Sequence, residues 1–295
     1  MEDMDKMFGS KDAVNRRGFL KGTSLAGLGL ASVGIAGSTL FSGATNVLAA
    51  NPPASSTSLN ATDIAILRFA LNLEYLEAEY YTVATTGKTL AEIGIPVTGL
   101  GSSGETFGGV QVNFAENDGE HNTDEDEDAP MATIAAQIAK DEQEHVMILR
   151  GALGSEVIAK PLINLAAYGQ IASRYAFLGA ARAFEDVGVS AYGGAAPLIT
   201  SKAILAVAAR IALTEGEHTG ALRMLVPLND VRTTPVDGQD VVPPPSGTEF
   251  FSNQGGLTIV RTPSQVLAIL FGSDAPGTRR GRYFPQGISG TFTHV

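Results

Sequence analysis

The sequence predicts an all-α protein built on a four-helix bundle, and three observations lead to that fold class. Four long segments place apolar residues at helical spacing, with helix-starting or helix-ending residues at their ends. Hydrophobic residues make up 44% of the 295 residues and charged residues 17%, which supplies enough apolar side chains for a packed core. At about 1.5 Å per residue, helices of about 22 residues span roughly 33 Å, a normal length for such a bundle.

The composition excludes several classes of function. The formal net charge is −11, which argues against a nucleic-acid partner, because such proteins usually carry a basic patch. The chain contains no Cys, so disulfides, thiolate metal sites and cysteine nucleophiles are excluded. Any metal ion must therefore be held by carboxylate and imidazole groups.

The first fifty residues, 1–50, carry the features of an export signal. The paired Arg16 and Arg17 precede an apolar, Gly-rich stretch over 25–41, and small residues follow at 47–50. This resembles a twin-arginine signal peptide, which implies export of a folded protein to a periplasmic or extracellular location. The alternative is an uncleaved membrane anchor, but about 17 apolar residues are few for a membrane span. We therefore expect no stable span in the mature protein.

The first predicted helical pair spans residues 60–84 and 130–153. Asn60 is a suitable N-terminal cap for the first helix, and Gly87 is expected to end it. Apolar residues recur on one face of each segment, and Gly154 is expected to end the second helix. Both helices are long enough to form one half of a bundle.

A long acidic insert, residues 87–129, separates these two helices. Residues 87–130 hold ten Asp or Glu against the single Lys88. Runs of this kind are usually solvated, mobile segments, which is the interpretation we adopt, with a weak cation-binding or partner-contacting loop as the alternative. The spacing of the acids does not match an EF-hand.

The second predicted pair spans residues 171–192 and 201–226 and completes a bundle over 60–226. Gly193 and Gly194 are expected to end the first of these helices, and Pro227 the second. Both segments are rich in Gly and Ala, which allows helices to approach closely. Close approach fits packing within the bundle as well as a homo-oligomer.

The remaining residues, 227–295, are expected to form a C-terminal extension packed on the bundle. This extension is rich in Pro and Gly, and one short helix is predicted over 263–271 with Thr262 as its cap. Tyr283 and Phe284 are best interpreted as packing residues of an ordered loop.

Two copies of one motif point to metal chemistry. Glu142 and His145 stand three residues apart in the second helix, and Glu215 and His218 repeat that spacing in the fourth. A separation of three residues places both side chains on one helical face. One such pair is usually solvated, but two pairs in corresponding helices favour a shared metal site.

The other two helices each supply one Glu in an apolar stretch. These are Glu74 in the first helix and Glu185 in the third. Each has a Tyr seven residues later, Tyr81 and Tyr192, on the same face two turns along. The chain thus contains two helical hairpins with one pattern.

The helix-by-helix order Glu, Glu-x-x-His, Glu, Glu-x-x-His resembles the ferritin-like di-iron carboxylate superfamily, which includes rubrerythrin-type proteins and dimanganese catalases. The segments 71–81 and 284–287 look most like the exported ferritin-like branch that includes plant desiccation-related proteins. The resemblance implies a ferritin-like four-helix bundle and a dimetal site. It also implies six ligands: two bridging carboxylates, Glu142 and Glu215; one histidine on each ion, His145 and His218; and two terminal carboxylates, Glu74 and Glu185.

Electrostatics makes a similar demand, because four carboxylates converging in a core would repel one another at a cost of several kcal/mol for each unpaired charge. Either two cations neutralise them, or several are protonated, or they do not converge. Oxygen ligands with one imidazole per ion suit iron or manganese better than zinc or copper.

Some assignments stay open at this point. Glu77, one turn after Glu74, is an alternative first ligand. Tyr81 and Tyr192 are candidate catalytic residues that contact the ligands, or else ordinary core tyrosines. The neighbouring acids Glu144, Glu217 and Asp186 are expected to face away, in water or in surface ion pairs.

The function expected from this site is oxidoreductase chemistry on peroxide or dioxygen, in protection against oxidative or desiccation stress. Peroxide reduction, catalase-like dismutation and ferroxidase activity all fit two redox metals. Without Cys there is no rubredoxin-type centre, which leaves self-contained chemistry or an external reductant. The alternative is a non-catalytic ferritin-like structural or binding protein of the cell envelope, with metal absent or only structural. A hydrolase finds little support, since no nucleophile pattern stands out.

Overall fold

The computed structural model describes residues 59–114 and 125–295, with side chains of the second range described from residue 131 onward. The predicted export signal over 1–50 lies outside the described residues. Among the helices that are described, none combines the length and the apolar character that crossing a membrane requires.

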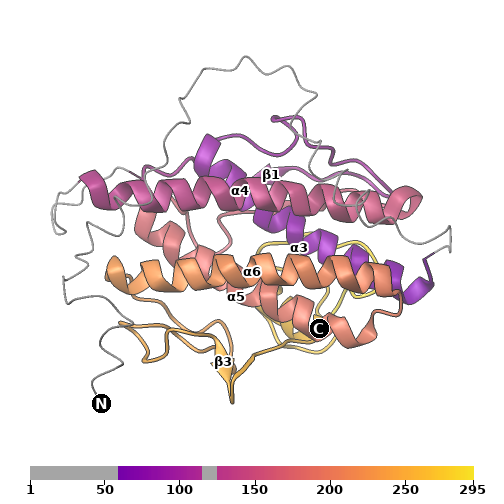
Figure 1. Cartoon of the computed structure of the whole chain (residues 1–295). Helices are drawn as coiled ribbons and strands as arrows, with labels where there is room; N and C mark the ends of the chain where they lie inside the picture. Colours follow the sequence, from indigo (N-terminus) through magenta and orange to yellow (C-terminus); the bar gives the residue numbers. More distant parts are fainter. Residues whose placement is uncertain (1–58, 115–124) are drawn as a thin grey trace, which may run out of the picture. The chain divides into compact units, whose positions relative to one another are not determined.

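Four long helices form the bundle, as the sequence predicts. α3 packs along α4 and α5 along α6, while α3 also contacts α5 and α4 contacts α6 (Figure 1). Two parallel residue pairs join β1 to β2, and β3 pairs antiparallel with β4. In chain order the elements are α3 (Ala61–Thr86), β1 (Thr106–Phe107), α4 (Glu125–Leu153), the 3₁₀ turn η1 (Gly154–Glu156), β2 (Ile163–Asn164), α5 (Arg174–Ala195), the 3₁₀ turn η2 (Ala196–Leu198), α6 (Lys202–Leu228), β3 (Asn253–Gln254), β4 (Leu257–Thr258) and α7 (Pro263–Phe271).

Side-chain caps begin several of these helices. The Asn60 side chain accepts a hydrogen bond from the Asp63 amide at 2.9 Å, and Gly87 ends α3 with φ of 71°. In this left-handed conformation the Gly87 N–H donates a hydrogen bond to the Val83 carbonyl oxygen in the last turn of the helix. Glycine adopts the conformation without strain. Thr262 and Gln265 form a capping box at the start of α7. The predicted first and last helices are therefore confirmed at their caps.

The predicted end of the third helix is wrong. α5 begins at Arg174, capped by Ser173, and continues through Gly193 and Gly194 to Ala195. Neither glycine has a positive φ. Instead, a Cβ on Gly194 would lie 2.1 Å from the Arg261 carbonyl oxygen, so this glycine lets the C-terminal extension cross the helix closely.

The insert also differs from its predicted form. α4 begins at Glu125, five residues before the predicted start, and acidic residues are favoured in the first turn of a helix by its dipole. Residues 87–114 are not a solvated loop: Leu90, Ile95 and Val112 are buried, and β1 pairs with β2. The apolar residues among the polar ones anchor this part of the insert, while 115–124 lie outside the described residues.

The C-terminal extension packs on the bundle. Phe284 is fully buried and Tyr283 nearly so, which confirms their predicted role in packing. Asp186 is buried as well, against expectation, and accepts a hydrogen bond at 2.7 Å from Arg223. The Arg223 guanidinium also donates to the Phe250 carbonyl oxygen at 2.7 Å. The expectation that Asp186 faces water is therefore wrong, because its partner Arg223 is itself covered by the extension.

We expect Gly194→Ala to destabilise the fold, because the new methyl group would meet the Arg261 carbonyl oxygen at 2.1 Å. Overpacking of this kind costs about 1–3 kcal/mol. Gly220→Ala is the matched control: no atom lies within 4 Å of its Cβ position, and replacing a mid-helix glycine stabilises by about 0.5–1 kcal/mol. Urea unfolding measures both variants. Equal stability of the two would contradict the role assigned to Gly194.

Candidate metal centre

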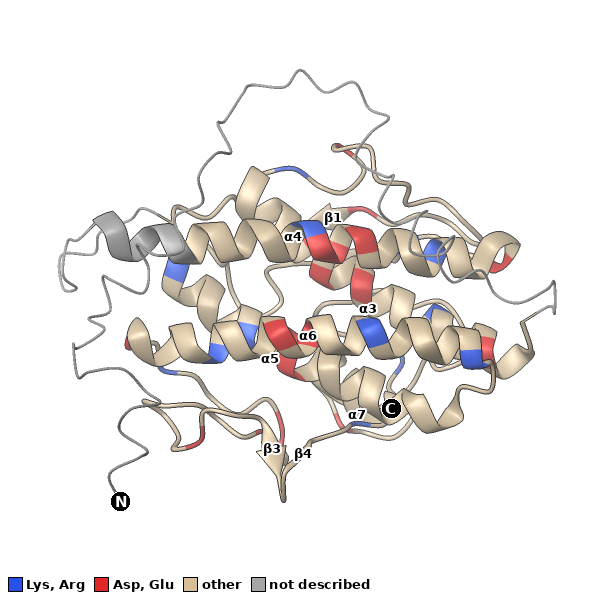
Figure 2. Ribbon diagram, viewed as in Figure 1, with Lys and Arg blue, Asp and Glu red and all other residues tan. Residues whose placement is uncertain are grey.

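Acidic residues of all four bundle helices gather midway along the bundle (Figure 2). The carboxylates of the sequence motif are completely buried and the two histidines are about 5–6% exposed. All six predicted ligands therefore lie in the core, each on its predicted helix: Glu74 on α3, Glu142 and His145 on α4, Glu185 on α5, and Glu215 and His218 on α6.

The six side chains divide into two overlapping groups. In each group, one ligand atom from every member lies within 4.8 Å of the others. Glu142 and Glu215 belong to both groups. The first group adds Glu74 and His145, and the second adds Glu185 and His218. Buried Glu and His side chains in this arrangement could hold metal ions at two adjacent positions.

Both histidines turn Nδ1 toward the carboxylates. His145 Nδ1 lies 3.3 Å from Glu74 Oε2, 3.3 Å from Glu142 Oε2 and 3.2 Å from Glu215 Oε1. His218 Nδ1 lies 3.2 Å from a Glu142 oxygen and 3.2 Å from a Glu185 oxygen. The Nδ1 atom of each ring carries at most one hydrogen, which can point toward only one of these carboxylate oxygens. A nitrogen surrounded by several carboxylate oxygens is the environment of a metal-binding imidazole.

Several carboxylate oxygens in this cluster lack hydrogen-bond partners among the described residues: Glu74 Oε2, Glu142 Oε1, Glu185 Oε1 and both oxygens of Glu215. Buried polar atoms are normally paired, because an unpaired one loses its solvation without compensation. The donor set and its unpartnered oxygens therefore fit divalent cations. Two such ions would offset the charge of four carboxylates.

Burial and mutual repulsion distort the pKa values of these groups. Burial, with repulsion from Glu142, raises the pKa of Glu74 to about 7. Burial followed by the charges of Glu142 and Glu185 raises the pKa of Glu215 well above its usual range. Burial opposes protonation of His218, but its hydrogen bonds to Asp141 and Glu185, together with the nearby Glu142 carboxylate, raise its pKa to about 12. Without metal, the cluster thus retains protons near neutral pH.

The two tyrosines approach the site crosswise. The Tyr192 hydroxyl, on α5, donates a hydrogen bond of 2.5 Å to Glu74 Oε1 on α3. Tyr81, on α3, is fully buried, and its pKa is raised by burial and then by the nearby charge of Glu185 on α5. Each tyrosine therefore lies beside the Glu of the other hairpin rather than beside its own. Helix packing brings about this exchange, and the spacing within one helix could not reveal it.

Glu77 occupies a separate place in the cluster. It is 4% exposed and stands outside both four-residue groups. A Cβ at Gly188 would lie 2.9 Å from Glu77 Oε1 and 2.9 Å from Glu215 Oε2, so a glycine on α5 leaves room for both carboxylates. Sequence reasoning missed this role of Gly188, because a glycine within a helix carries no signal for a facing side chain.

Asp141 is a further residue that sequence reasoning missed. Its Oδ2 lies 3.3 Å from His218 Nε2, on the side of the ring away from the carboxylate cluster. A carboxylate on the second ring nitrogen fixes the tautomer and orientation of a metal-binding histidine. Asp141 contacts His218 on α6, a helix far away in the sequence. The only signal in the sequence was the position of Asp141 next to Glu142.

A cavity of about 290 Å³ lies beside the cluster between α4 and α6. His145 and Asp141 line it from α4, and Arg210 and Thr214 from α6. One water molecule takes about 30 Å³ in the liquid, so the cavity admits a small molecule. This is the side from which a ligand could reach His145.

A family model of the ferritin-like domain matches residues 62–227. The chain belongs to the ferritin-like domain family. The match covers all four bundle helices, and with them the six clustered residues. No curated protein and no solved structure gives a match. The family therefore accounts for the ferritin-like bundle, whereas the C-terminal extension over 228–295 lies beyond the matched residues.

The pKa values predict how the stability of the metal-free protein depends on pH. A carboxyl whose pKa rises from 4.5 to about 7 on folding stabilises the fold while it is protonated. That stabilisation, about 3 kcal/mol for Glu74, is lost as the pH rises from 4.5 through 7. His218 has the same sign, since its pKa is raised to about 12. The lowered pKa of Glu142 matters only below pH 4.5.

We therefore expect the melting temperature of metal-free protein to fall between pH 5 and pH 8, as measured by circular dichroism in a series of buffers. Protein loaded with Mn²⁺ is the control, and its melting temperature should fall less, because bound cations replace the protons. A metal-free protein that becomes more stable over this range would contradict the proximity of the four carboxylates.

Proposed function

We propose that this ferritin-like protein binds two iron or manganese ions in its bundle and uses them for peroxide or dioxygen chemistry. The observation that carries the proposal is the pair of four-residue groups that share Glu142 and Glu215. The two shared carboxylates would bridge the ions, and each ion would have one histidine and one terminal carboxylate, Glu74 or Glu185.

The nature of the ligands supports this choice of metals. Carboxylate oxygens dominate the set, and each group contains a single imidazole. Such ligands favour iron and manganese, whereas zinc and copper prefer more nitrogen or sulfur. Bound in this way, the two ions would supply electrons to peroxide or dioxygen, or, in dismutation, accept them from a second peroxide molecule.

Other side chains would hold the ligands in place and control access. The Tyr192 hydroxyl holds Glu74 through its hydrogen bond of 2.5 Å, and Asp141 orients the His218 ring. The cavity between α4 and α6 suits an oxidant as small as hydrogen peroxide. Since the cluster is otherwise buried, this cavity would be the route by which an oxidant enters.

The proposed location is outside the cytoplasm, after export by the twin-arginine route. Support comes from the paired Arg16 and Arg17 with the apolar stretch that follows them. A protein exported in folded form could acquire its metal before export. We propose that it protects the cell envelope or its surroundings from oxidants, in the manner of a stress protein.

Metal analysis tests the proposal directly. We expect protein purified without added metal, and then offered Fe²⁺ or Mn²⁺, to hold two ions per chain by elemental analysis. His145→Ala and His218→Ala should each lose one or both ions, with affinity lower by about 10–100-fold or more. His294→Ala is the matched control, because His294 is an exposed histidine of the extension. The loaded protein should also remove hydrogen peroxide faster than the metal-free protein. A folded protein that binds neither metal would support the non-catalytic alternative instead.

A pair of isosteric changes distinguishes the two candidate first ligands. Glu74 lies in a group with His145, whereas Glu77 lies outside both groups. We therefore expect Glu74→Gln to reduce the metal content to about one ion per chain or fewer. Glu77→Gln should retain two ions, because the amide keeps the shape of the carboxylate beside Gly188. The reverse result would make Glu77 the ligand.

A further inference from the structure

A row of five aromatic rings runs between the protein surface and the metal centre. Tyr168 is 60% exposed, and its ring centroid lies 5.5 Å from that of Tyr283. Tyr283 lies 5.1 Å from Phe184, and Phe184 lies 4.8 Å from Tyr80. The Tyr80 and Tyr81 centroids are 5.1 Å apart. Every ring thus contacts the next one in the row.

The inner end of the row reaches a proposed metal ligand. Tyr81 is fully buried, and after burial the charge of the nearby Glu185 contributes most to raising the pKa of the Tyr81 hydroxyl group. Four of the five rings are tyrosines, and the chain has no Trp and no Cys. Phenol groups give up an electron more readily than other side chains available in this row. Electron transfer also weakens steeply with distance, so a continuous row of rings favours it over the surrounding aliphatic core.

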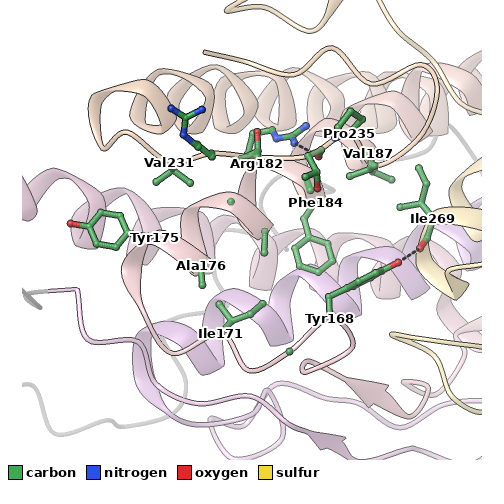
Figure 3. A pocket seen from close by; sticks show the side chains of 18 of the residues that line it. Tyr168, Ile171, Tyr175, Ala176, Arg182, Phe184, Val187, Val231, Pro235 and Ile269 are labelled. Atoms are coloured by element: carbon green, nitrogen blue, oxygen red, sulfur yellow. Dashed lines mark hydrogen bonds between the residues drawn. The ribbon is translucent and has the colours of Figure 1, made fainter. Parts of the chain in front are cut away.

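The outer end of the row opens into a cavity. This cavity has a volume of about 550 Å³ and lies on the outer side of α5, against α7 and residues 231–236. Tyr168, Phe184 and Tyr283 all line it. Figure 3 shows the Tyr168 and Phe184 rings near one another at this cavity, with the Tyr168 hydroxyl bonded to the Ile269 carbonyl oxygen at 3.3 Å. The volume falls in the range of small-molecule sites.

The cavity also has two buried polar atoms without hydrogen-bond partners among the described residues. These are Arg182 Nε and Thr233 Oγ1, and both residues line the cavity. Arg182 is 1% exposed and Thr233 is 9% exposed. With Arg182 and Thr233 the lining has a polar part, beside which the hydroxyl group of a ligand could lie. Its ring would pack against the aromatic side chains.

We propose that this cavity binds a small phenol or hydroquinone, and that the row of rings carries electrons from it to the metal centre. This inference rests on the proposed function and on the form of it in which a reductant from outside the chain supplies the electrons. The two reactants would enter at different places. The oxidant cavity is lined by α4 and α6, whereas the reductant cavity is lined by α5, α7 and their neighbours.

The reaction balances with these two reactants alone. Two phenol molecules each lose one electron and one proton and become phenoxyl radicals. One hydrogen peroxide molecule takes up the two electrons and two protons, its O–O bond breaks, and two water molecules leave. The electrons pass through the rings, and the phenol protons enter the solvent at the cavity, where Tyr168 is exposed.

Binding is tested first, in full-length protein without metal, with 4-methylphenol as the probe and calorimetry as the measurement. We expect saturable binding of one molecule per chain. Ala180→Phe fills the cavity, which Ala180 lines, and should weaken binding about tenfold or more. Binding that is absent, or that is unchanged in Ala180→Phe, would overturn the assignment of the cavity.

Electron transfer is tested next, in metal-loaded protein with hydrogen peroxide and the same phenol. Tyr168→Leu and Tyr283→Phe should slow phenol oxidation about tenfold or more at equal metal content. Phe251→Leu is the matched control, since Phe251 is a 66% exposed ring outside the row, and should oxidise phenol at the wild-type rate. Peroxide added without phenol should produce a tyrosyl radical signal in electron paramagnetic resonance, weaker in Tyr283→Phe.

The outcomes separate the two proposals. Wild-type protein that binds no metal, or that is loaded and leaves peroxide unchanged, contradicts the proposed function. Protein that consumes peroxide with Fe²⁺ as reductant, but oxidises phenol equally fast in Tyr168→Leu and Tyr283→Phe, overturns the row of rings and leaves the proposed function intact.

Discussion

The mutual repulsion of buried carboxylates is the constraint on which the rest of this structure depends. Four glutamates with no exposed surface meet in the core, and Glu77 stands close to them at 4% exposure. Leaving such charges uncompensated costs several kcal/mol each. Protons can neutralise them, as the raised pKa values of Glu74 and Glu215 indicate, and so can cations. The stability of the bundle therefore depends on whether protons or cations neutralise this cluster.

The helices meet this constraint through a repeated pattern. Each hairpin contributes one isolated Glu and one Glu-x-x-His pair, and the halves come together so that Glu142 and Glu215 are shared. Their tyrosines are exchanged, since Tyr192 holds the Glu74 carboxylate of the opposite hairpin. Gly188 then leaves the space that two of the carboxylates need. The proposed ligands, the tyrosine that contacts one of them and the glycine that leaves room for them therefore lie on different helices at the same level of the bundle.

The segments outside the bundle cover its helices and form the second cavity, the one proposed to bind the reductant. The insert over 87–114 buries Leu90, Ile95 and Val112 against the helices. The extension contacts α5 through the hydrogen bond from Arg182 to Asp240, and α6 through the hydrogen bond from Arg223 to the Phe250 carbonyl oxygen. Covering α5 also creates the cavity in which Phe184 and Tyr283 meet Tyr168.

Local sequence determined the four helices, some of their caps and the six clustered residues, because helical periodicity and a three-residue spacing act within one helix. It misplaced the end of α5, because Gly193 and Gly194 serve close packing rather than a turn. The expected end of α6 at Pro227 is also wrong, since Pro227 lies inside the helix, which continues to Leu228. Local sequence described the insert as solvated, because charge in 115–130 outweighed the scattered apolar residues of 87–114. Only the tertiary structure decided which tyrosine meets which glutamate, that Asp141 supports His218, and that five rings form a row. These contacts join residues far apart in the chain, and helix packing alone brings them together.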